Sequence, residues 1–279
     1  SLLGLGCTTG SNYSSRSDYD KNQDTATQDT AEADTDTDTD TDTDTDTDTD
    51  TDTDTGPELC KNDYHPIHQT GWSKTFTSTY EGETSIATEE GIGETTWNGL
   101  PVYAYRDTMT VTKSDLVGNP VDTGWDMTVY VSCDYEGQEG MFMLAWSGSA
   151  TQCDFCIVGA IPPAEYTVDA TLSPYRRYLS AEFGVGFEGS WEYDYQLQIN
   201  AVDAEGSPQQ QSEQVTGRYQ DAGFQTITIM EGTSQQQSVN AYKIVNTVTQ
   251  TDDFGQVTES YIEQYWVKGM GMVQEDFVD

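Results

Sequence analysis

Apolar and polar side chains alternate along residues 125 to 135, and this period of two residues restricts the fold more than any other feature. The apolar positions are Trp125, Met127, Val129, Val131, Cys133 and Tyr135. Residues 191 to 200 alternate in the same way and carry a largely aromatic apolar face. Successive side chains of a β-strand point to opposite faces, so both segments are predicted to be strands with one buried face.

Further strands and turns extend this pattern over the C-terminal part of the chain. Strand character recurs in residues 72–80, 103–112, 141–147, 224–230, 241–250 and 261–268, and turn-forming sequences occur at 98–99, 118–120, 136–140 and 252–255. Only residues 172–182 show a weak helical period. We therefore predict an all-β, antiparallel domain of about eight to ten strands, whose strongly curved sheet forms a partly closed barrel or a sandwich.

Two short blocks suggest an internal duplication of this domain. The order Ala-Tyr-basic followed by Thr-Val-Thr occurs at residues 104–112 and again at residues 241–249. If the blocks are copies, the domain consists of two similar meanders, residues 60–147 and 184–279, joined by an irregular connector over residues 148–183. Chance similarity between strands rich in Thr and Tyr is the alternative.

The segment before this domain has the composition of a linker. Residues 8–57 contain no Trp, Phe, Leu, Ile, Val or Met, and residues 34–55 alternate strictly between Asp and Thr. Such a segment cannot bury enough apolar surface to offset its ordering entropy, and its like charges repel one another. We predict a disordered acidic linker over residues 8–59 and a folded domain over residues 60–279. The repeat lacks the Gly and Glu positions of an EF-hand, so no defined metal site is expected.

The chain begins Ser-Leu-Leu-Gly-Leu-Gly-Cys. The small and apolar residues before Cys7 resemble the lipobox of bacterial lipoproteins, although Gly4 and Leu5 stand where that pattern has Leu and a small residue. The resemblance implies that residues 1–7 end a signal peptide and that a lipid on Cys7 holds the protein on a membrane. The alternative is a short apolar stub with an unpaired cysteine.

Two further resemblances imply that the protein belongs to a bacterial envelope. Asp-Thr repeats similar to this one follow the lipid-bearing cysteine in surface lipoproteins of some predatory and soil-dwelling Gram-negative bacteria, which implies display from the outer membrane. Residues 265–273, Tyr-Trp-Val-Lys-Gly-Met-Gly-Met-Val, resemble the motif that closes a lipoprotein-associated domain family of unknown function. No functional residue carries over from that family, and the two glycines indicate a bend in the sheet.

The cysteines give a second structural expectation. If Cys7 carries lipid, an even set remains in an exported protein, namely Cys60, Cys133, Cys153 and Cys156. Two disulfides follow as the default, with three possible pairings left open. A zinc site and a redox pair at Cys153 and Cys156 are the alternatives, and neither has its usual sequence context. His65 and His68 flank Pro66 and are expected to be solvated loop residues.

The charge excludes several classes of partner. The chain has a formal net charge of −38, and residues 60–279 hold 9 basic and 32 acidic residues, a net charge of −23 from 9 minus 32. Nucleic acid and anionic lipid are therefore not expected partners. One basic cluster flanked by aromatic residues is a possible contact for an anion, a sugar or an acidic partner: Tyr175, Arg176, Arg177 and Tyr178. Solvated arginines paired with acids are the alternative.

No catalytic set is recognisable, and no cofactor is expected. Both histidines lie in one loop, there is no Gly-x-Ser-x-Gly motif, and acidic residues are too numerous for any pair to be informative. We favour a surface-displayed β domain that contacts protein or polysaccharide. A carrier of lipid or another hydrophobic ligand is the main alternative, and a carboxylate-dependent hydrolase is the third. Exposed aromatic side chains would favour the surface-displayed binding domain, and an apolar cavity would favour the carrier. Two shielded carboxylates that face one pocket would favour the hydrolase. The oligomeric state stays open.

Overall fold

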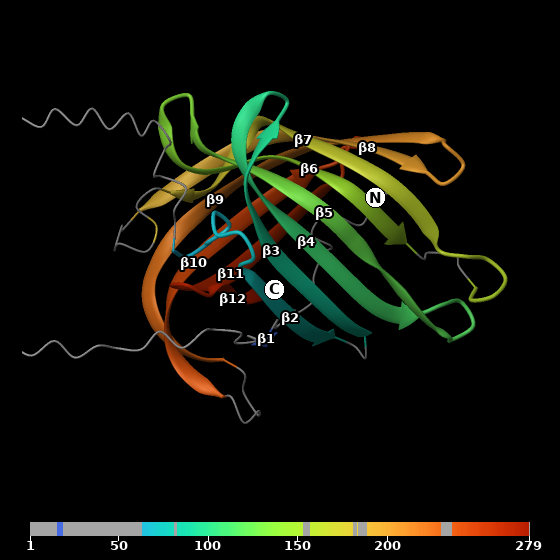
Figure 1. Cartoon of the computed structure of the whole chain (residues 1–279), viewed down its shortest axis with the longest axis horizontal. Coiled ribbons are helices and arrows are strands. Elements are labelled where there is room, and N and C mark those ends of the chain that lie inside the picture. Colours follow the sequence, from blue (N-terminus) through green and yellow to red (C-terminus); the bar gives the residue numbers. More distant parts are fainter. Residues whose placement is uncertain are drawn as a thin grey trace, which may run out of the picture. The chain divides into compact units, whose positions relative to one another are not determined.

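The computed structural model describes residues 16–18, 63–80, 83–152, 157–180, 183, 189–229 and 236–278. It confirms the all-β antiparallel fold, because each strand in this part of the chain pairs antiparallel with the next one in a single sheet. Figure 1 shows the long strands curling into a nearly closed barrel. The strands are β1 (Arg16–Asp18), β2 (Ser73–Tyr80), β3 (Glu83–Trp97), β4 (Leu100–Ser114), β5 (Pro120–Tyr135), β6 (Gln138–Gln152), β7 (Ala164–Ser180), β8 (Ser190–Asp203), β9 (Pro208–Ile229), β10 (Gln237–Thr251), β11 (Val257–Val267) and β12 (Gly271–Val278).

The predicted alternation defines the inner wall of the barrel. On β8 every second residue from Trp191 to Ala201 is buried, and the residues between them are exposed. The same alternation places Met127, Val129 and Val131 of β5 in the interior. The main apolar cluster of the described residues therefore fills the barrel. None of these residues forms a helix long and apolar enough to cross a membrane.

One turn sequence, Asp-x-x-Gly-polar, recurs at three hairpins of the same end of the barrel. In the β8–β9 turn, Asp203 Oδ1 accepts hydrogen bonds from the backbone N–H groups of Glu205 (3.1 Å) and Ser207 (2.7 Å). Gly206 follows with a φ of 83°, which glycine adopts without strain. Residues 115–119 and 252–256 repeat this geometry. Because the strands alternate in direction, all three hairpins lie at one end of the sheet.

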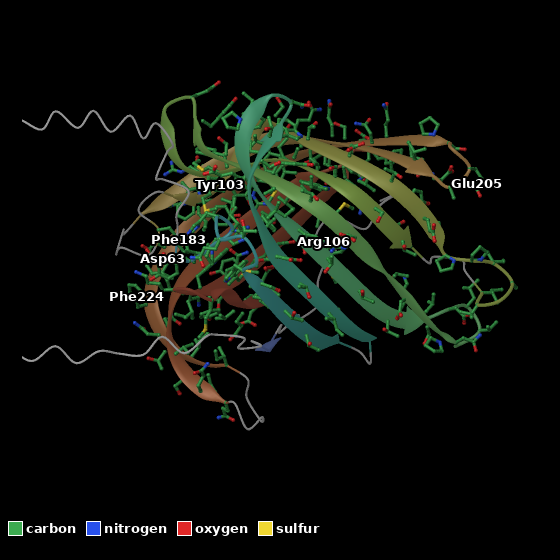
Figure 2. All side chains as sticks on the ribbon, in the orientation of Figure 1. Asp63, Tyr103, Arg106, Phe183, Glu205 and Phe224 are labelled. Carbon is green, nitrogen blue, oxygen red and sulfur yellow. The ribbon has the colours of Figure 1, made fainter. Side chains whose placement is uncertain are left out.

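Residues 63–72 form a loop, here called the plug, that enters the opposite end of the barrel. Ile67 of the plug is fully buried. The plug is tied to the β11–β12 turn by a hydrogen bond from the Gly269 N–H to the Asp63 carbonyl (2.6 Å). Figure 2 shows Asp63 and Phe183 at this end and Glu205 at the other. One end of the barrel is therefore closed by the chain's own residues.

Three sequence-based expectations are wrong. The predicted connector, residues 148–183, is not irregular, because β7 spans Ala164–Ser180 within it and pairs with both β6 and β8. The weak helix over residues 172–182 is largely part of this strand. Tyr135, the last residue of β5, does not share the inward face, because it packs against the outer apolar cluster beside Phe142. The sheet is continuous from β6 through β7 to β8, and the internal duplication stays a prediction.

Candidate functional site

The plug brings His65 into a ring of aromatic side chains inside the barrel. The ring centroids of Tyr105, Tyr178, Trp266 and Trp72 lie 5.1, 5.7, 5.8 and 6.1 Å from the imidazole centroid. His65 Nδ1 and the Tyr178 hydroxyl are 2.8 Å apart. Burial lowers the pKa of His65, which Glu89 only partly counteracts. The expectation of a solvated histidine is therefore wrong for His65, which is a neutral core residue.

A buried ion pair lies beside this histidine. Lys74 Nζ of β2 is 2.7 Å from Glu89 Oε2 of β3, and the Lys74 side chain is only 2% exposed. The same amine donates a hydrogen bond to the Met272 carbonyl of β12 (3.3 Å). Burial favours the protonated acid, yet the charge of Lys74 and the contact with His65 outweigh it and lower the pKa of Glu89 to about 2. This amine thus links β2 to β12, where the barrel closes.

Glu89 also has an acidic neighbour on the adjacent strand. Asp107 of β4 is the direct partner of Glu89 in the β3–β4 register. Burial, and then the negative charge of Glu89, raise the pKa of Asp107 to about 7, although a hydrogen bond with Trp125 opposes the shift. Two adjacent carboxyl groups with separated pKa values are a pattern of acid–base sites. Neither group lines the pocket described below.

The predicted contact cluster at residues 175–178 is divided between the two faces of β7. Arg176 points inward, where its guanidinium carbon lies 5.0 Å from the Tyr193 ring centroid and 5.5 Å from that of Tyr219. It also donates a hydrogen bond to the Tyr219 hydroxyl. Tyr178 is buried, the Arg177 carbonyl accepts a hydrogen bond from Trp191 Nε1 (3.2 Å), and Tyr175 lies on the outer face. The four residues therefore do not form one exposed surface.

The interior has the properties of a filled core. Large side chains from β4 to β12 meet inside the barrel, and the plug and Phe183 pack against them. Phe183 lies 5.0 Å from Tyr242 and 5.5 Å from Trp266, measured between ring centroids. A ligand carrier needs an apolar cavity instead.

The outer face of the barrel carries four partly exposed aromatic residues, here called the outer aromatic row: Tyr130, Trp97, Tyr175 and Tyr135. Neighbouring ring centroids along the row are 6.2, 6.3 and 4.6 Å apart. The rings cover a small apolar cluster formed by Val102, Phe142, Leu144 and Ala145. They come from three different strands, β3, β5 and β7, so the sheet holds them in fixed positions.

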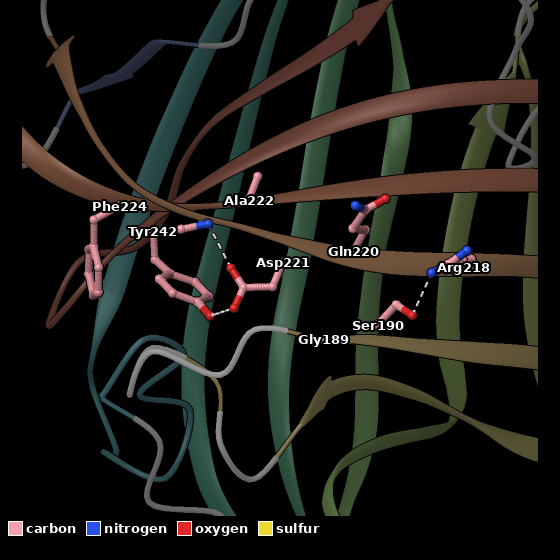
Figure 3. A pocket seen from close by; sticks show the side chains of 9 residues that line it. Gly189, Ser190, Arg218, Gln220, Asp221, Ala222, Phe224 and Tyr242 are labelled. Carbon is pink, nitrogen blue, oxygen red and sulfur yellow. Dashed lines mark hydrogen bonds between the residues drawn. The ribbon is translucent and has the colours of Figure 1, made fainter.

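A pocket of about 640 Å³ lies where β8 begins, at the plug end of the barrel. Figure 3 shows Arg218, Gln220, Asp221, Phe224 and Tyr242 around it. Arg218 donates a hydrogen bond to Ser190 Oγ (2.8 Å), and Asp221 accepts hydrogen bonds from the Gly223 N–H (2.7 Å) and the Tyr242 hydroxyl. The pocket therefore combines an exposed phenyl ring with charged groups of both signs. No sequence motif predicted it.

The remaining predicted site residues are mostly outside the described part of the chain. Cys133 is buried on the inner face of β5. Cys7, Cys60, Cys153 and Cys156 lie outside the described residues, so lipidation and disulfide pairing stay predictions. Among the residues that are described, no group of three or more His, Cys, Asp or Glu side chains is arranged to hold a metal ion.

No family model, no curated protein and no solved structure matches this chain. The functional argument therefore depends on the geometry of the chain itself.

Proposed function

We propose that the chain is a lipid-anchored envelope protein whose β-barrel domain binds a neutral polysaccharide on the outer aromatic row. The observation that carries this proposal is the continuous series of four partly exposed rings, Tyr130, Trp97, Tyr175 and Tyr135. Aromatic rings offer large, rigid contact surfaces at a low entropic cost. The C–H faces of sugar rings stack on such surfaces, and tyrosine hydroxyl groups hydrogen-bond to sugar hydroxyl groups.

The charge of the domain supports a neutral ligand. With a net charge of −23 over residues 60–279, from 9 basic and 32 acidic residues, the domain repels acidic polysaccharides at long range. Tyrosine and tryptophan also serve as anchors in protein interfaces, so a protein partner is the competing occupant of this surface. The large side chains that meet inside the barrel argue against the carrier hypothesis.

Replacing Trp97 by alanine is expected to weaken polysaccharide binding by about tenfold or more, because truncating a central interface anchor typically costs about 2 kcal/mol or more, and about 1.4 kcal/mol corresponds to tenfold. Binding of the full chain to a panel of neutral β-glucan, α-glucan and mannan would be measured by affinity electrophoresis and calorimetry. Tyr261, a 40% exposed aromatic residue on β11, gives the matched control Tyr261→Ala. If no glycan of the panel is bound, or if both variants bind equally well, the outer aromatic row is not a polysaccharide site.

The anchor is tested separately from the binding. We expect the protein isolated from the producing envelope to carry a diacylglycerol on Cys7, so that it partitions into the detergent phase of a phase separation. Cys7→Ser should move it to the aqueous phase, whereas Cys60→Ser should not. An unmodified Cys7 in the mass spectrum of the N-terminal peptide would remove the anchor from the proposal and leave the glycan site untouched.

A further inference from the structure

β9 continues beyond the point where its pairing with β8 ends. The ladder between them runs from the pair Val202 and Pro208 to the pair Ser190 and Gln220, and a hydrogen bond from the Asp221 N–H to the Gly189 carbonyl (2.9 Å) ends it. From Phe224 to Ile229, β9 pairs only with β10. Figure 1 shows this part of β9 curving away from the barrel. Within the described residues, the backbone N–H and C=O groups on that side have no neighbouring strand.

This edge is held in an extended conformation before any partner arrives. Six consecutive pairs, from Gln237 with Ile229 to Tyr242 with Phe224, fix its register against β10. Ile229 belongs to a second apolar cluster with residues of β10, β11 and β12, and Ile227 packs against the same cluster. A partner strand would therefore not have to supply the free energy needed to order β9.

The part of this edge that the structure describes also lacks the features that normally prevent strand addition. Its sequence, Phe-Gln-Thr-Ile-Thr-Ile over residues 224–229, contains no charged residue, no proline and no glycine. Natural proteins commonly protect such edges with charges, prolines or covering segments. The outer edge of β2 shows such protection, because β1 pairs with β2 and Lys74 of β2 bonds to the Met272 carbonyl of β12.

The pocket lies at the base of this edge. Phe224 begins the unpaired stretch and lines the pocket, with a side chain that is 48% exposed. The carboxylate of Asp221 lies on the same side of the pocket as Phe224, and Arg218 is farther away and bonded to Ser190 (Figure 3). A cationic side chain that follows the edge would meet an aromatic face and then a carboxylate, both of which attract it.

We infer that the β9 edge binds an extended basic peptide segment of a protein partner by strand addition, with one Lys or Arg side chain in the pocket. Backbone hydrogen bonds supply the affinity in this binding mode, and side-chain pockets supply the selectivity. The domain's net charge of −23, from 9 basic and 32 acidic residues over residues 60–279, attracts a basic segment and disfavours a second copy of the chain. This site is separate from the outer aromatic row, so either can exist without the other.

The probe for the test is a fluorescent nine-residue peptide of alternating Lys and Thr, titrated into the full chain by fluorescence anisotropy. Two control peptides are used. One alternates Glu and Thr, and the other alternates Lys and Thr but carries a proline at its centre. We expect binding of the first peptide only. Phe224→Ala and Thr226→Lys should each weaken it by about tenfold, because one removes the pocket's aromatic face and the other places a positive charge on the edge.

Matched controls separate this effect from general charge and folding. Thr171→Lys adds the same charge to β7, which is paired on both sides, and Tyr261→Ala removes an exposed aromatic residue elsewhere. Both should bind within twofold of the unmodified chain, and all variants should keep its circular dichroism spectrum. The inference would be overturned if the Glu and Thr peptide bound equally well or if the central proline did not weaken binding. It would also be overturned if Phe224→Ala and Thr226→Lys left the affinity unchanged. A concentration-dependent dimer that Thr226→Lys dissociates would assign the edge to a second copy instead.

Discussion

Replacing Lys74 by methionine is expected to lower the free energy of unfolding by about 3–5 kcal/mol, which is the range found when one partner of a buried ion pair is removed. Lys74 Nζ lies 2.7 Å from Glu89 Oε2 and is 4.5 Å from the Phe76 ring centroid. Methionine keeps the apolar stem of the side chain but leaves the carboxylate of Glu89 buried without its cation. Urea unfolding at pH 8 would measure the loss.

The double variant Lys74→Met with Glu89→Gln separates the charge from the packing. Without the carboxylate, no uncompensated charge is left, so the double variant should recover most of the lost stability. The deficit of the single variant should also shrink toward pH 4, since a Glu89 carboxyl that has lost its cation takes up a proton more readily. A double variant as unstable as the single one would show that packing, and not charge, is the cause.

The strands with a regular apolar period could be predicted from the sequence, and those without one could not. β8 alternates from Trp191 to Ala201, and the structure gives the same inward set. β3 lacks such a period, because its inward positions include Glu89 and Gly91, which do not have the apolar character of a buried face. The pairing that makes Glu89 tolerable comes from Lys74 on a neighbouring strand. A pattern within one strand does not contain this information.

The basic cluster of β7 illustrates a different limit. Tyr175 and Tyr178 flank two arginines in the sequence, which suggested one exposed patch. On a strand, however, neighbouring residues point to opposite faces, so Arg176 and Tyr178 lie inside the barrel while Tyr175 lies outside. A cluster of adjacent residues on a strand is therefore divided between the two faces of the sheet.

Each of the two candidate surfaces depends on how several strands lie relative to one another. A motif within one segment therefore does not predict either of them. The outer aromatic row unites residues of three strands, and Tyr135 joins it at the end of β5, where its ring centroid lies 4.6 Å from that of Tyr175. The β9 edge exists because β9 continues for nine residues after its last pair with β8, at Gln220. Strand ends and register shifts depend on the whole sheet, whereas a sequence motif describes one segment.

Replacing Asp107 by asparagine is expected to raise the free energy of unfolding, relative to the unmodified chain, more at neutral and alkaline pH than at acidic pH. The folded-state pKa of Asp107, about 7, lies far above its ordinary value of 3.8. Between these two values the folded state holds a proton that the unfolded state has released, so stability falls as the pH rises through this window. Asparagine has the same shape and keeps an oxygen toward Trp125, but it cannot acquire the buried negative charge beside Glu89.

The expected size of this effect is roughly 2–4 kcal/mol between pH 4 and pH 8, since one pKa unit corresponds to about 1.4 kcal/mol. It is obtained as the difference between the unfolding free energies of the variant and the unmodified chain at each pH. The lowered pKa of His65 acts in the opposite sense, reducing stability as the pH falls below about 6.5, and it cancels in this difference. The exposed Asp169 on β7 gives the control Asp169→Asn, which removes one carboxylate from the outer face. A difference that does not change with pH for Asp107→Asn would mean that the Asp107 carboxyl is ionised in the folded protein, and that solvent or a local rearrangement screens it from Glu89.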